Sequence, residues 1–372
     1  MKKKRILVTG LTENPGGVES FFINLHRYVD HTVLQFDFIK HTPLPLAYED
    51  EFKAAGGKVF YLCGRRKNPF RHYMDYSAFY RHNAQNYNGI YCNLLSLTNI
   101  DDLKFARRYG IPMRIAHSHN NGDDASAYRQ LREWLHCSHQ SSIGQYATRL
   151  MACSAAAGKW MFGKYPFTVM PNAIDISQYQ YRDVYRKQIR EQLHLSPDTL
   201  VLGTVGRLTE QKNPMFLVEL LREIHSRCPN CVFLHVGEGP LRPELEQAVT
   251  ANRLEKTYRI LGNRTEVYKY YSAMDAFVFP SVYEGFGIAL LEAQAAGLHC
   301  FVSPAIPQEV MIPGKLCRRM GNLADVYQWA EAILTERQSF SERPDTSGLL
   351  REQGYDIKTE ALKFQTLLLR GG

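Results

Sequence analysis

Residues 201–206 read Val-Leu-Gly-Thr-Val-Gly, and residues 6–10 read Ile-Leu-Val-Thr-Gly. Each stretch is a short apolar run that ends in glycine. A loop over residues 207–213 follows the later run, a loop over residues 11–17 follows the earlier one, and a helical pattern comes next in both cases. A buried strand, a glycine-bearing loop and a helix form the opening unit of a parallel α/β sheet. The repetition predicts one such sheet in each half of the chain.

The rest of the chain alternates between apolar runs and helical patterns in the same way. The predicted strands cover residues 5–9, 32–39, 58–62, 89–94, 113–119, 149–153 and 167–170, then 200–206, 232–236, 259–261, 276–280 and 300–303. The pattern therefore predicts an α/β protein with two Rossmann-like domains, over residues 1–175 and 176–350, and a final amphipathic helix within 351–372. We place the link between the domains in the polar stretch 175–190. Ligands of such sheets bind at the carboxyl ends of the strands.

Composition fits this picture. The chain has 372 residues, of which 45% are hydrophobic and 22% charged, so two globular domains are expected. The eight cysteines are scattered, which favours reduced thiols and a cytoplasmic location over a disulfide framework or a zinc site. The net charge of +8 suits an anionic partner, but no nucleic-acid-binding module is recognisable. No apolar run is long enough to span a bilayer.

The most specific motif is the nine-residue run from Glu284 to Glu292, Glu-Gly-Phe-Gly-Ile-Ala-Leu-Leu-Glu. Its glycines suit a turn into a helix, so the backbone N–H groups of Phe286, Gly287 and Ile288 are expected to point at an anion. Glu284 lies in the turn and can accept hydrogen bonds from sugar hydroxyls. Glu292 is expected about 12 Å further along the helix. That spacing suits a second polar contact to an extended ligand, such as a ribose.

Other polar groups gather at predicted strand ends. Arg207 and Lys212 flank a helix start, where a guanidinium fork and an ammonium can hold a diphosphate as it gains charge. Gly16 and Gly17 precede the first helix and could equally form a plain turn. His117 and His119 end a strand and share one face of it, so either can reach a ligand.

With these motifs, and with the runs at residues 116–120, 171–175, 237–240 and 261–262, the chain resembles the retaining nucleotide-sugar glycosyltransferases of family four. The resemblance covers essentially the whole chain and is strongest to bacterial members that build exopolysaccharide and capsule. It implies the GT-B fold, in which two Rossmann-like domains face each other across a cleft. The N-terminal domain would bind the acceptor and the C-terminal domain the nucleotide sugar, with the last helix packing back toward the N-terminal domain. Gly287 departs from the pattern, since proline is common there.

The resemblance also implies a role for each site residue. Arg207 and Lys212 would hold the donor diphosphate, Glu284 the donor sugar and Glu292 the ribose. His119 aligns best with an active-site histidine that contacts the donor sugar, with His117 second. The remaining implied donor contacts are Asn263 and Arg264 near the base, and Gly16 and Gly17 closing the diphosphate site from the other domain.

The predicted activity is the metal-independent transfer of a hexosyl group from a UDP-sugar to an acceptor hydroxyl, with retention of configuration. No cofactor is expected, and no Asp-x-Asp motif for a metal is present. Two alternatives stay open: a UDP-sugar epimerase of similar fold, and a nucleotide-sugar-binding protein without catalysis.

The acceptor is expected to be a lipid-linked saccharide. Residues 64–82 interleave basic and aromatic side chains, beginning with Arg65, Arg66 and Lys67. Cations and aromatic rings favour an anionic membrane surface. This segment is therefore a candidate for peripheral docking at the inner face of the plasma membrane. The alternative is an ordinary basic helix whose aromatic side chains pack into the core.

Overall fold

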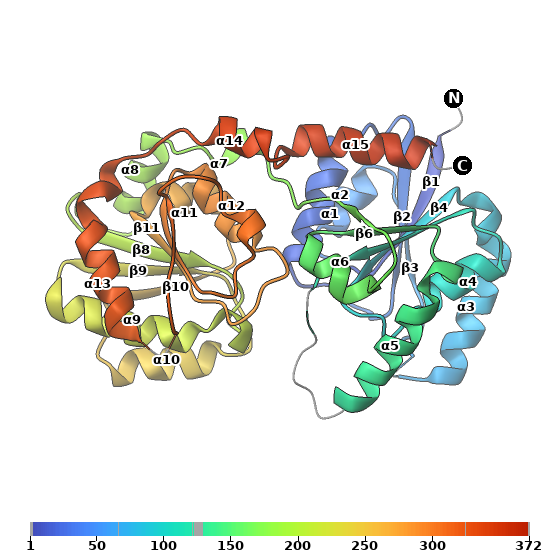
Figure 1. Cartoon of the computed structure of the whole chain (residues 1–372), viewed down its shortest axis with the longest axis horizontal. Helices are drawn as coiled ribbons and strands as arrows, with labels where there is room; N and C mark the ends of the chain where they lie inside the picture. Colours follow the sequence, from blue (N-terminus) through green and yellow to red (C-terminus); the bar gives the residue numbers. More distant parts are fainter. Residues whose placement is uncertain (1–2, 66, 121, 123–128, 324, 371–372) are drawn as a thin grey trace. The chain divides into compact units, whose positions relative to one another are not determined.

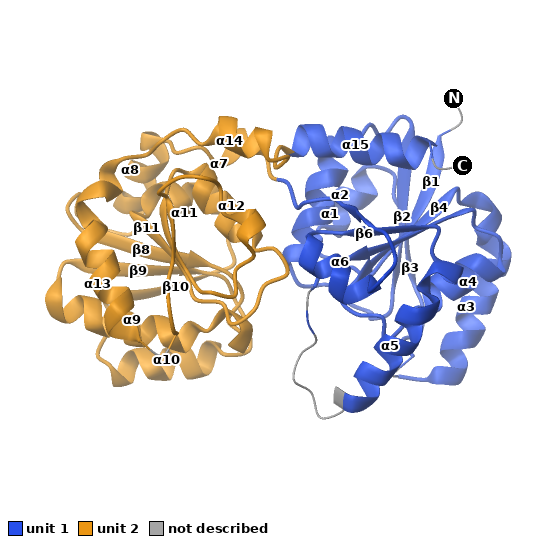
Figure 2. Cartoon of the chain, in the orientation of Figure 1, with its two compact units in different colours: residues 1–173, 357–372 blue, residues 174–356 orange. Residues whose placement is uncertain are grey.

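The structure is a computed structural model that describes residues 3–65, 67–120, 122, 129–323 and 325–370 (Figure 1). The chain forms two compact units, shown in different colours in Figure 2. Unit 1 comprises Met1–Ala173 and Ile357–Gly372, and unit 2 comprises Ile174–Asp356. Each unit contains one parallel sheet with helices on both faces, so the fold class predicted from the sequence is confirmed.

The sheet of unit 1 has seven strands in the order β3-β2-β1-β4-β5-β6-β7. The strands are β1 Lys4–Thr9, β2 Leu34–Lys40, β3 Val59–Tyr61, β4 Gly89–Leu94, β5 Met113–Ser118, β6 Arg149–Ala152 and β7 Thr168–Val169. The α-helices are α1 Gly17–Tyr28, α2 Glu49–Ala54, α3 Pro69–Asn83, α4 Asp101–Arg108, α5 Arg129–Tyr146, α6 Ala155–Phe162 and α15 Ile357–Arg370, with a 3-10 turn η1 at Ala84–Asn86. Helices cover both faces, which is why the central strands are apolar without alternation.

The C-terminal helix α15 belongs to unit 1 although it follows unit 2 in the chain. It packs along α1. Phe364 stacks on Phe36 of β2 at 6.3 Å and meets Tyr91 of β4 edge-on at 5.2 Å. The Lys4 ammonium donates to the Leu369 carbonyl at 2.7 Å. The apolar side of this helix therefore completes the core on one face of the sheet.

The sheet of unit 2 has six strands in the order β10-β9-β8-β11-β12-β13. The strands are β8 Leu200–Val205, β9 Cys231–Val236, β10 Tyr258–Gly262, β11 Ala276–Phe279, β12 His299–Val302 and β13 Cys317–Arg319. The α-helices are α7 Ile176–Tyr179, α8 Asp183–Gln192, α9 Pro214–Arg227, α10 Arg242–Ala251, α11 Val267–Ala273, α12 Ile288–Ala295, α13 Val326–Glu336 and α14 Ser347–Glu352; the 3-10 turns are η2 Glu210–Lys212, η3 Gln308–Val310 and η4 Arg337–Ser341. Helices α9, α10 and α13 pack together on one face, and α7, α8, α11 and α12 on the other.

The polar stretch 175–190, in which we placed the interdomain link, is instead part of unit 2. It contains α7 and most of α8. Arg186 and Arg190 of α8 both bind Asp275, with N–O distances of 2.7 and 2.8 Å. The arginines are held by a carboxylate far along the chain, so the stretch folds as helix although its composition suggests a linker.

Both sheets have the strand order of a doubly wound fold. In unit 2, the first strand β8 lies between β9 and the fourth strand β11, so successive connections leave in opposite directions from β8 and β11. In unit 1 the same reversal lies between β1 and β4. The loops at the carboxyl ends of such a strand pair diverge and leave a crevice where ligands bind. We therefore expect ligand sites at the loops after β8 and β11 in unit 2, and after β1 and β4 in unit 1.

Candidate active site

The loop after β8 is shaped by close backbone approach. A Cβ on Gly237 would lie 1.9 Å from the carbonyl oxygen of Gly206. The loop after β9 can therefore pack this closely against the loop after β8 only because position 237 is glycine. Asn213 takes a left-handed conformation, with φ of 53°, and Pro214 occupies the first turn of α9. The turn η2 before it carries Lys212 back over the end of the sheet.

Lys212 and Glu284 form an ion pair at the switch point of unit 2, which is the place between β8 and β11 where the direction of the connections reverses. Their side chains are only 17% and 7% exposed. The Lys212 ammonium also lies 4.7 Å from the ring centroid of Phe279, the last residue of β11, in a cation–π contact. The two charges therefore hold each other at the carboxyl ends of β8 and β11.

Hydrogen bonds join the two loops that carry this ion pair. The Gln211 side-chain amide donates to the Tyr283 carbonyl at 3.0 Å, and the Val282 N–H donates to the Gln211 carbonyl at 2.8 Å. Arg207 is exposed, and its guanidinium lies 3.5 Å from the Gln211 side-chain oxygen. The structure thus brings three predicted residues, Arg207, Lys212 and Glu284, to one place.

The turn from β11 into α12 depends on Gly287. Its φ is 96°, in the left-handed region, which proline cannot adopt. This turn therefore differs from one with proline at that position. Phe286 is buried and packs edge-on against Tyr355 at 5.6 Å, which anchors the turn. Helix α12 begins at Ile288, and its first N–H groups have no intrahelical acceptor, so they form a partial positive charge at the end of the sheet.

Glu292 lies about 6 Å of helical rise beyond Ile288, the first residue of α12. Residues 284–287 are not helical, so the helical rise of about 12 Å expected between Glu284 and Glu292 does not apply to that part of the run. Its carboxyl group is buried and accepts a hydrogen bond from the Tyr271 hydroxyl at 2.7 Å. Burial raises the pKa of Glu292 to about 7. No motif in the sequence points to Tyr271, which lies on a different helix, α11.

Asn263 and Arg264 follow β10 and are both exposed. Because β10 is the edge strand beyond β9, these residues stand apart from the switch point. In the described part of the chain, no contact links them to Lys212 or Glu284. Their place near the base stays a prediction.

In unit 1, Gly16 and Gly17 lie at the amino end of α1 as predicted from the sequence. The Glu19 carboxylate accepts hydrogen bonds from the backbone N–H and the hydroxyl of Thr12, both at 2.8 Å, and so closes the loop after β1. A Cβ on Gly17 would meet nothing within 4 Å. The loop has open space at that position, and its role in donor binding stays a prediction.

His117 and His119 share one face at the end of β5, as predicted, and their ring centroids are 4.2 Å apart. They differ in exposure. His117 is fully buried and hydrogen-bonds the Tyr91 hydroxyl. His119 is partly exposed, and its Nε2 lies 2.9 Å from the Asn93 side-chain oxygen. Burial lowers the pKa of His119 to about 3, so its ring is neutral at physiological pH.

The basic and aromatic segment 64–82 forms a turn and most of α3. Arg66 lies outside the described residues. Arg65 pairs with Asp101 at 3.3 Å, whereas Lys67 is exposed. The aromatic side chains divide between core and surface: Tyr76, Phe79 and Tyr80 are buried, whereas Phe70 and Tyr73 are exposed.

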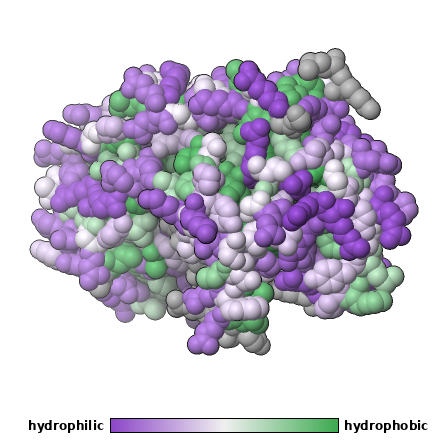
Figure 3. Space-filling model, turned by 45° about the vertical axis from the view of Figure 1, so that its right-hand side comes forward, coloured by the Kyte–Doolittle hydropathy of each residue, from purple (hydrophilic) through white to green (hydrophobic). Residues whose placement is uncertain are grey.

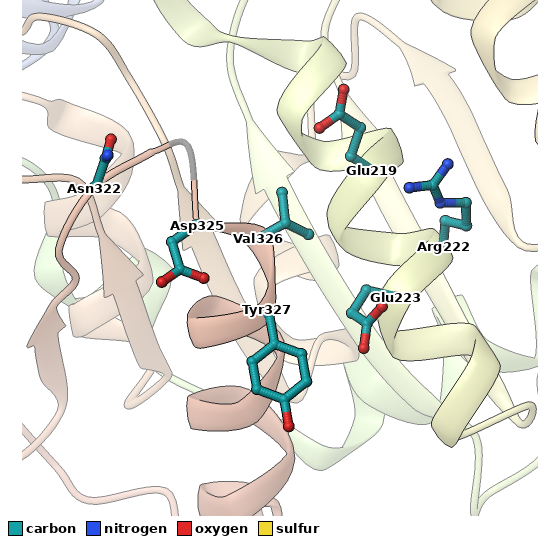
Figure 4. Close-up of a pocket in the computed structure, with 7 residues that line it drawn as sticks. All are labelled: Glu219, Arg222, Glu223, Asn322, Asp325, Val326 and Tyr327. Atoms are coloured by element: carbon teal, nitrogen blue, oxygen red, sulfur yellow. The ribbon is translucent and has the colours of Figure 1, made fainter.

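A separate pocket of about 490 Å³ lies between α9 and α13 of unit 2 (Figure 4). Its lining consists of Glu219, Arg222, Glu223, Asn322, Asp325, Val326 and Tyr327. None of the predicted site residues is among them.

The described residues contain no group of three or more His, Cys, Asp or Glu side chains that could hold a metal ion. Among the described helices, none is long and apolar enough to cross a membrane.

Known proteins resemble the chain in sequence. Residues 199–336, within unit 2, match the family model described as "Glycosyl transferases group 1". The "Putative glycosyltransferase EpsF" of Bacillus subtilis is 29% identical over 365 residues, which cover 96% of this chain and 94% of that protein. The "UDP-Gal:alpha-D-GlcNAc-diphosphoundecaprenol alpha-1,3-galactosyltransferase" of Escherichia coli is 31% identical over 171 residues, covering 45% of this chain and 44% of that protein.

Solved structures resemble it in fold. Anabaena HepE, crystallised with UDP and glucose, superposes with a TM-score of 0.78 at 19% identity, covering 98% of this chain and 99% of HepE. Sucrose-phosphate synthase from Thermosynechococcus elongatus gives a TM-score of 0.75 at 19% identity, covering 99% of each chain. At these identities the likeness establishes the fold, which is GT-B. The chain thus has the GT-B fold, and its residues 199–336 match the group 1 glycosyltransferases.

Proposed function

We propose that this glycosyltransferase moves a hexosyl group from a UDP-sugar to an acceptor hydroxyl, with retention of configuration and without a metal ion. One observation carries the proposal: Lys212 and Glu284 meet at the switch point of unit 2, beside Arg207 and the amino end of α12. HepE, which shares the fold, was crystallised with UDP-glucose. The motifs suggest a role in exopolysaccharide or capsule synthesis.

The chemistry follows from the charges at this place. The bond between the sugar C1 and the diphosphate oxygen breaks, and the leaving diphosphate gains negative charge. The Arg207 guanidinium, the Lys212 ammonium and the amino end of α12 stabilise that charge. Attack of the acceptor hydroxyl on the same face of the sugar forms the new C1–O bond, and a phosphate oxygen takes the acceptor proton. Glu284 accepts hydrogen bonds from the sugar hydroxyls.

His119 contributes as a neutral group. Because burial lowers its pKa to about 3, the ring is neutral near neutral pH and is not a general acid there. It can instead hydrogen-bond a sugar hydroxyl, as its contact with Asn93 shows its ring to be fixed in orientation. His117 is fully buried beneath it and supports that position.

The acceptor in this proposal is a saccharide on a lipid diphosphate. The E. coli relative acts on such a molecule by its name, which supports the assignment. For docking, the structure favours Lys67, Phe70 and Arg71, which are exposed near the start of α3, over Arg65. The Arg71 side chain is 73% exposed although it pairs with Asp75 at 3.8 Å, whereas Arg65, paired with Asp101, is 38% exposed. Figure 3 shows apolar and polar side chains intermixed on the face that it presents.

Transfer itself is tested with UDP-glucose, UDP-galactose and UDP-N-acetylglucosamine, each with and without an undecaprenyl-diphosphate-linked sugar. Acceptor-dependent UDP release, with an α-linked product by NMR, is expected. Conversion of the donor to its epimer without acceptor would identify an epimerase instead. Binding of donor without any turnover would leave only a binding protein.

Docking is tested by co-sedimentation with phosphatidylglycerol or phosphatidylcholine liposomes at low and physiological salt. Two exposed cations near an anionic leaflet contribute about 2 kcal/mol, so Lys67→Ser with Arg71→Ser should weaken binding to phosphatidylglycerol roughly 30-fold. Lys256→Ser with Arg259→Ser, which removes two exposed cations of unit 2, is the matched control. Equal binding to both lipids, or equal loss in both variants, would refute docking through α3.

A further inference from the structure

The two glutamates of the motif are both buried, yet their partners differ in kind. Glu284 faces the ammonium of Lys212. Glu292 faces phenols: Tyr271 of α11 at 2.7 Å and Tyr179 of α7. No cation among the described residues comes within ion-pair distance of Glu292. A buried carboxylate without a cation is costly, because desolvation penalises the charged form.

The hydroxyl of Tyr271 has one proton and two neighbours that could accept it. Besides Glu292, it lies 3.1 Å from the backbone carbonyl of Ala289, which can only accept. If the Glu292 carboxyl is protonated, it donates to the Tyr271 oxygen, and the Tyr271 proton goes to the Ala289 carbonyl. Every group then has a partner. If Glu292 is ionised, the Tyr271 proton has to serve both acceptors, and the Tyr179 hydroxyl is the other donor to the carboxylate.

The elements packed around Glu292 bring no positive charge to it, and burial outweighs the hydrogen bonds of the two phenols, which favour the ionised form. Helix α12 packs against α7, α11, β11 and β12. Toward Glu292 and Tyr271 these elements present further phenol and thiol groups rather than charges, namely Tyr179 and Cys300. The charged or basic groups elsewhere on these elements are engaged with other partners: Lys269 with Glu266 and His299 with Glu336. Burial accordingly raises the pKa of Glu292 to about 7.

We propose that burial without a cation keeps Glu292 as a carboxylic acid in the free enzyme, where Tyr271 is a positioning residue for the carboxyl group, and that nucleotide binding releases this proton to solvent. The inference rests on the proposed function, in which Glu292 binds the ribose. Ribose presents two hydroxyl donors, and a carboxylate can accept both, whereas a carboxylic acid has lost part of its acceptor capacity. The ligand therefore selects the ionised form.

The expected pH dependence follows from linkage. Below the pKa of the free enzyme, binding has to remove a proton and is weakened; above it, the carboxylate is already present. With a free-state pKa of about 7 for Glu292 and a bound-state value well below 6, affinity should rise about tenfold from pH 6 to pH 8. Close to one proton should be released from Glu292 per nucleotide bound at pH 6, and only about a tenth of a proton at pH 8.

Calorimetry of UDP-glucose binding without acceptor measures this release, using buffers of different ionisation enthalpy at pH 6, 7 and 8. UDP-glucose is the suitable probe, because the terminal phosphate of free UDP titrates near about pH 6 and would add its own proton, as other phosphate monoesters do. Glu292→Gln should abolish both the release and the pH dependence.

Tyr271→Phe separates positioning from a merely structural role. Its hydroxyl lowers the pKa of Glu292, so its loss should move the affinity transition to higher pH. A structural effect would instead weaken binding equally at every pH. Tyr270→Phe, which removes a buried phenol from the same helix, is the control and should leave the transition in place.

The outcomes separate this inference from the proposed function. Binding of UDP-glucose with no proton release and a flat affinity between pH 6 and 8 would overturn the inference and leave the donor assignment standing. Absence of UDP-glucose binding at any pH, with GDP- or ADP-glucose binding instead, would overturn the donor assignment alone. The same calorimetry with that nucleotide sugar would then decide the inference, since its ribose is the same.

Discussion

Replacing Lys212 with methionine tests the proposed catalysis most directly. Methionine keeps an unbranched chain over Phe279 but removes the ammonium that pairs with Glu284. The change has two separable consequences. The diphosphate loses a cation during transfer, and Glu284 loses its partner in the free enzyme.

The magnitudes follow from the exposure of the two groups. A preorganised group that stabilises charge in the transition state contributes about 3 kcal/mol, so turnover by Lys212→Met should fall at least a hundredfold. Because the side chains of the ion pair are 17% and 7% exposed, the orphaned Glu284 should also destabilise unit 2, by about 2 kcal/mol. For a domain of this size, that corresponds to a melting temperature about 4–8 °C lower.

Turnover is measured as acceptor-dependent UDP release, and stability by calorimetric melting. The double variant Lys212→Met with Glu284→Gln removes both charges, so it should recover most of the melting temperature but none of the activity. Glu284→Gln alone should bind UDP more tightly, since Lys212 no longer has an internal partner, while turnover falls. Activity of Lys212→Met within fivefold of the parent enzyme would refute the diphosphate role.

The other predictions concern the second cation, metals and acid. Arg207→Ala should cut turnover about a hundredfold with an unchanged melting temperature, because the exposed guanidinium has only a 3.5 Å contact with Gln211; a large loss of stability would contradict this. Activity should persist in EDTA, and loss that magnesium or manganese restores would disprove metal independence. Burial lowers the pKa of His26 and His235 to about 4 and of His119 to about 3. Above about pH 6.5 these histidines are neutral in both the folded and the unfolded chain, so the free energy of unfolding should be at its full value there. It should fall as the pH drops toward 4, by about 1.4 kcal/mol per pH unit per histidine, which denaturant titrations at pH 7, 6 and 5 would measure.

The sequence predicted the strands well because buried parallel strands are continuous apolar runs. The run at residues 89–94 matches β4 in full, and most other strand boundaries shift by one or two residues. Strand β13 was missed, since Cys317–Arg319 is short, ends in two arginines and lies at the sheet edge. The helices in 175–190 were missed for a different reason: Arg190 is buried by its bond to Asp275, a partner that no local pattern reveals.

The candidate site was predictable in position but not in its internal contacts. Glycine-rich turns after apolar strands locate Arg207, Lys212 and the motif around Glu284. The pairing of Lys212 with Glu284 joins residues 72 positions apart and depends on β8 lying beside β11. That strand order follows from the packing of the whole sheet, and alternation of strands and helices does not specify it.

Charge state is the property that the motif conceals most completely. Glu284 and Glu292 are the same residue type in one nine-residue run, and both are buried. Lys212 supplies a positive charge to the first, and the two side chains form an ion pair. Tyr271 supplies only a dipole to the second, and burial then raises its pKa to about 7. Because the partners come from η2 and α11, a change in either element can alter the chemistry of the motif while leaving every residue of the motif unchanged.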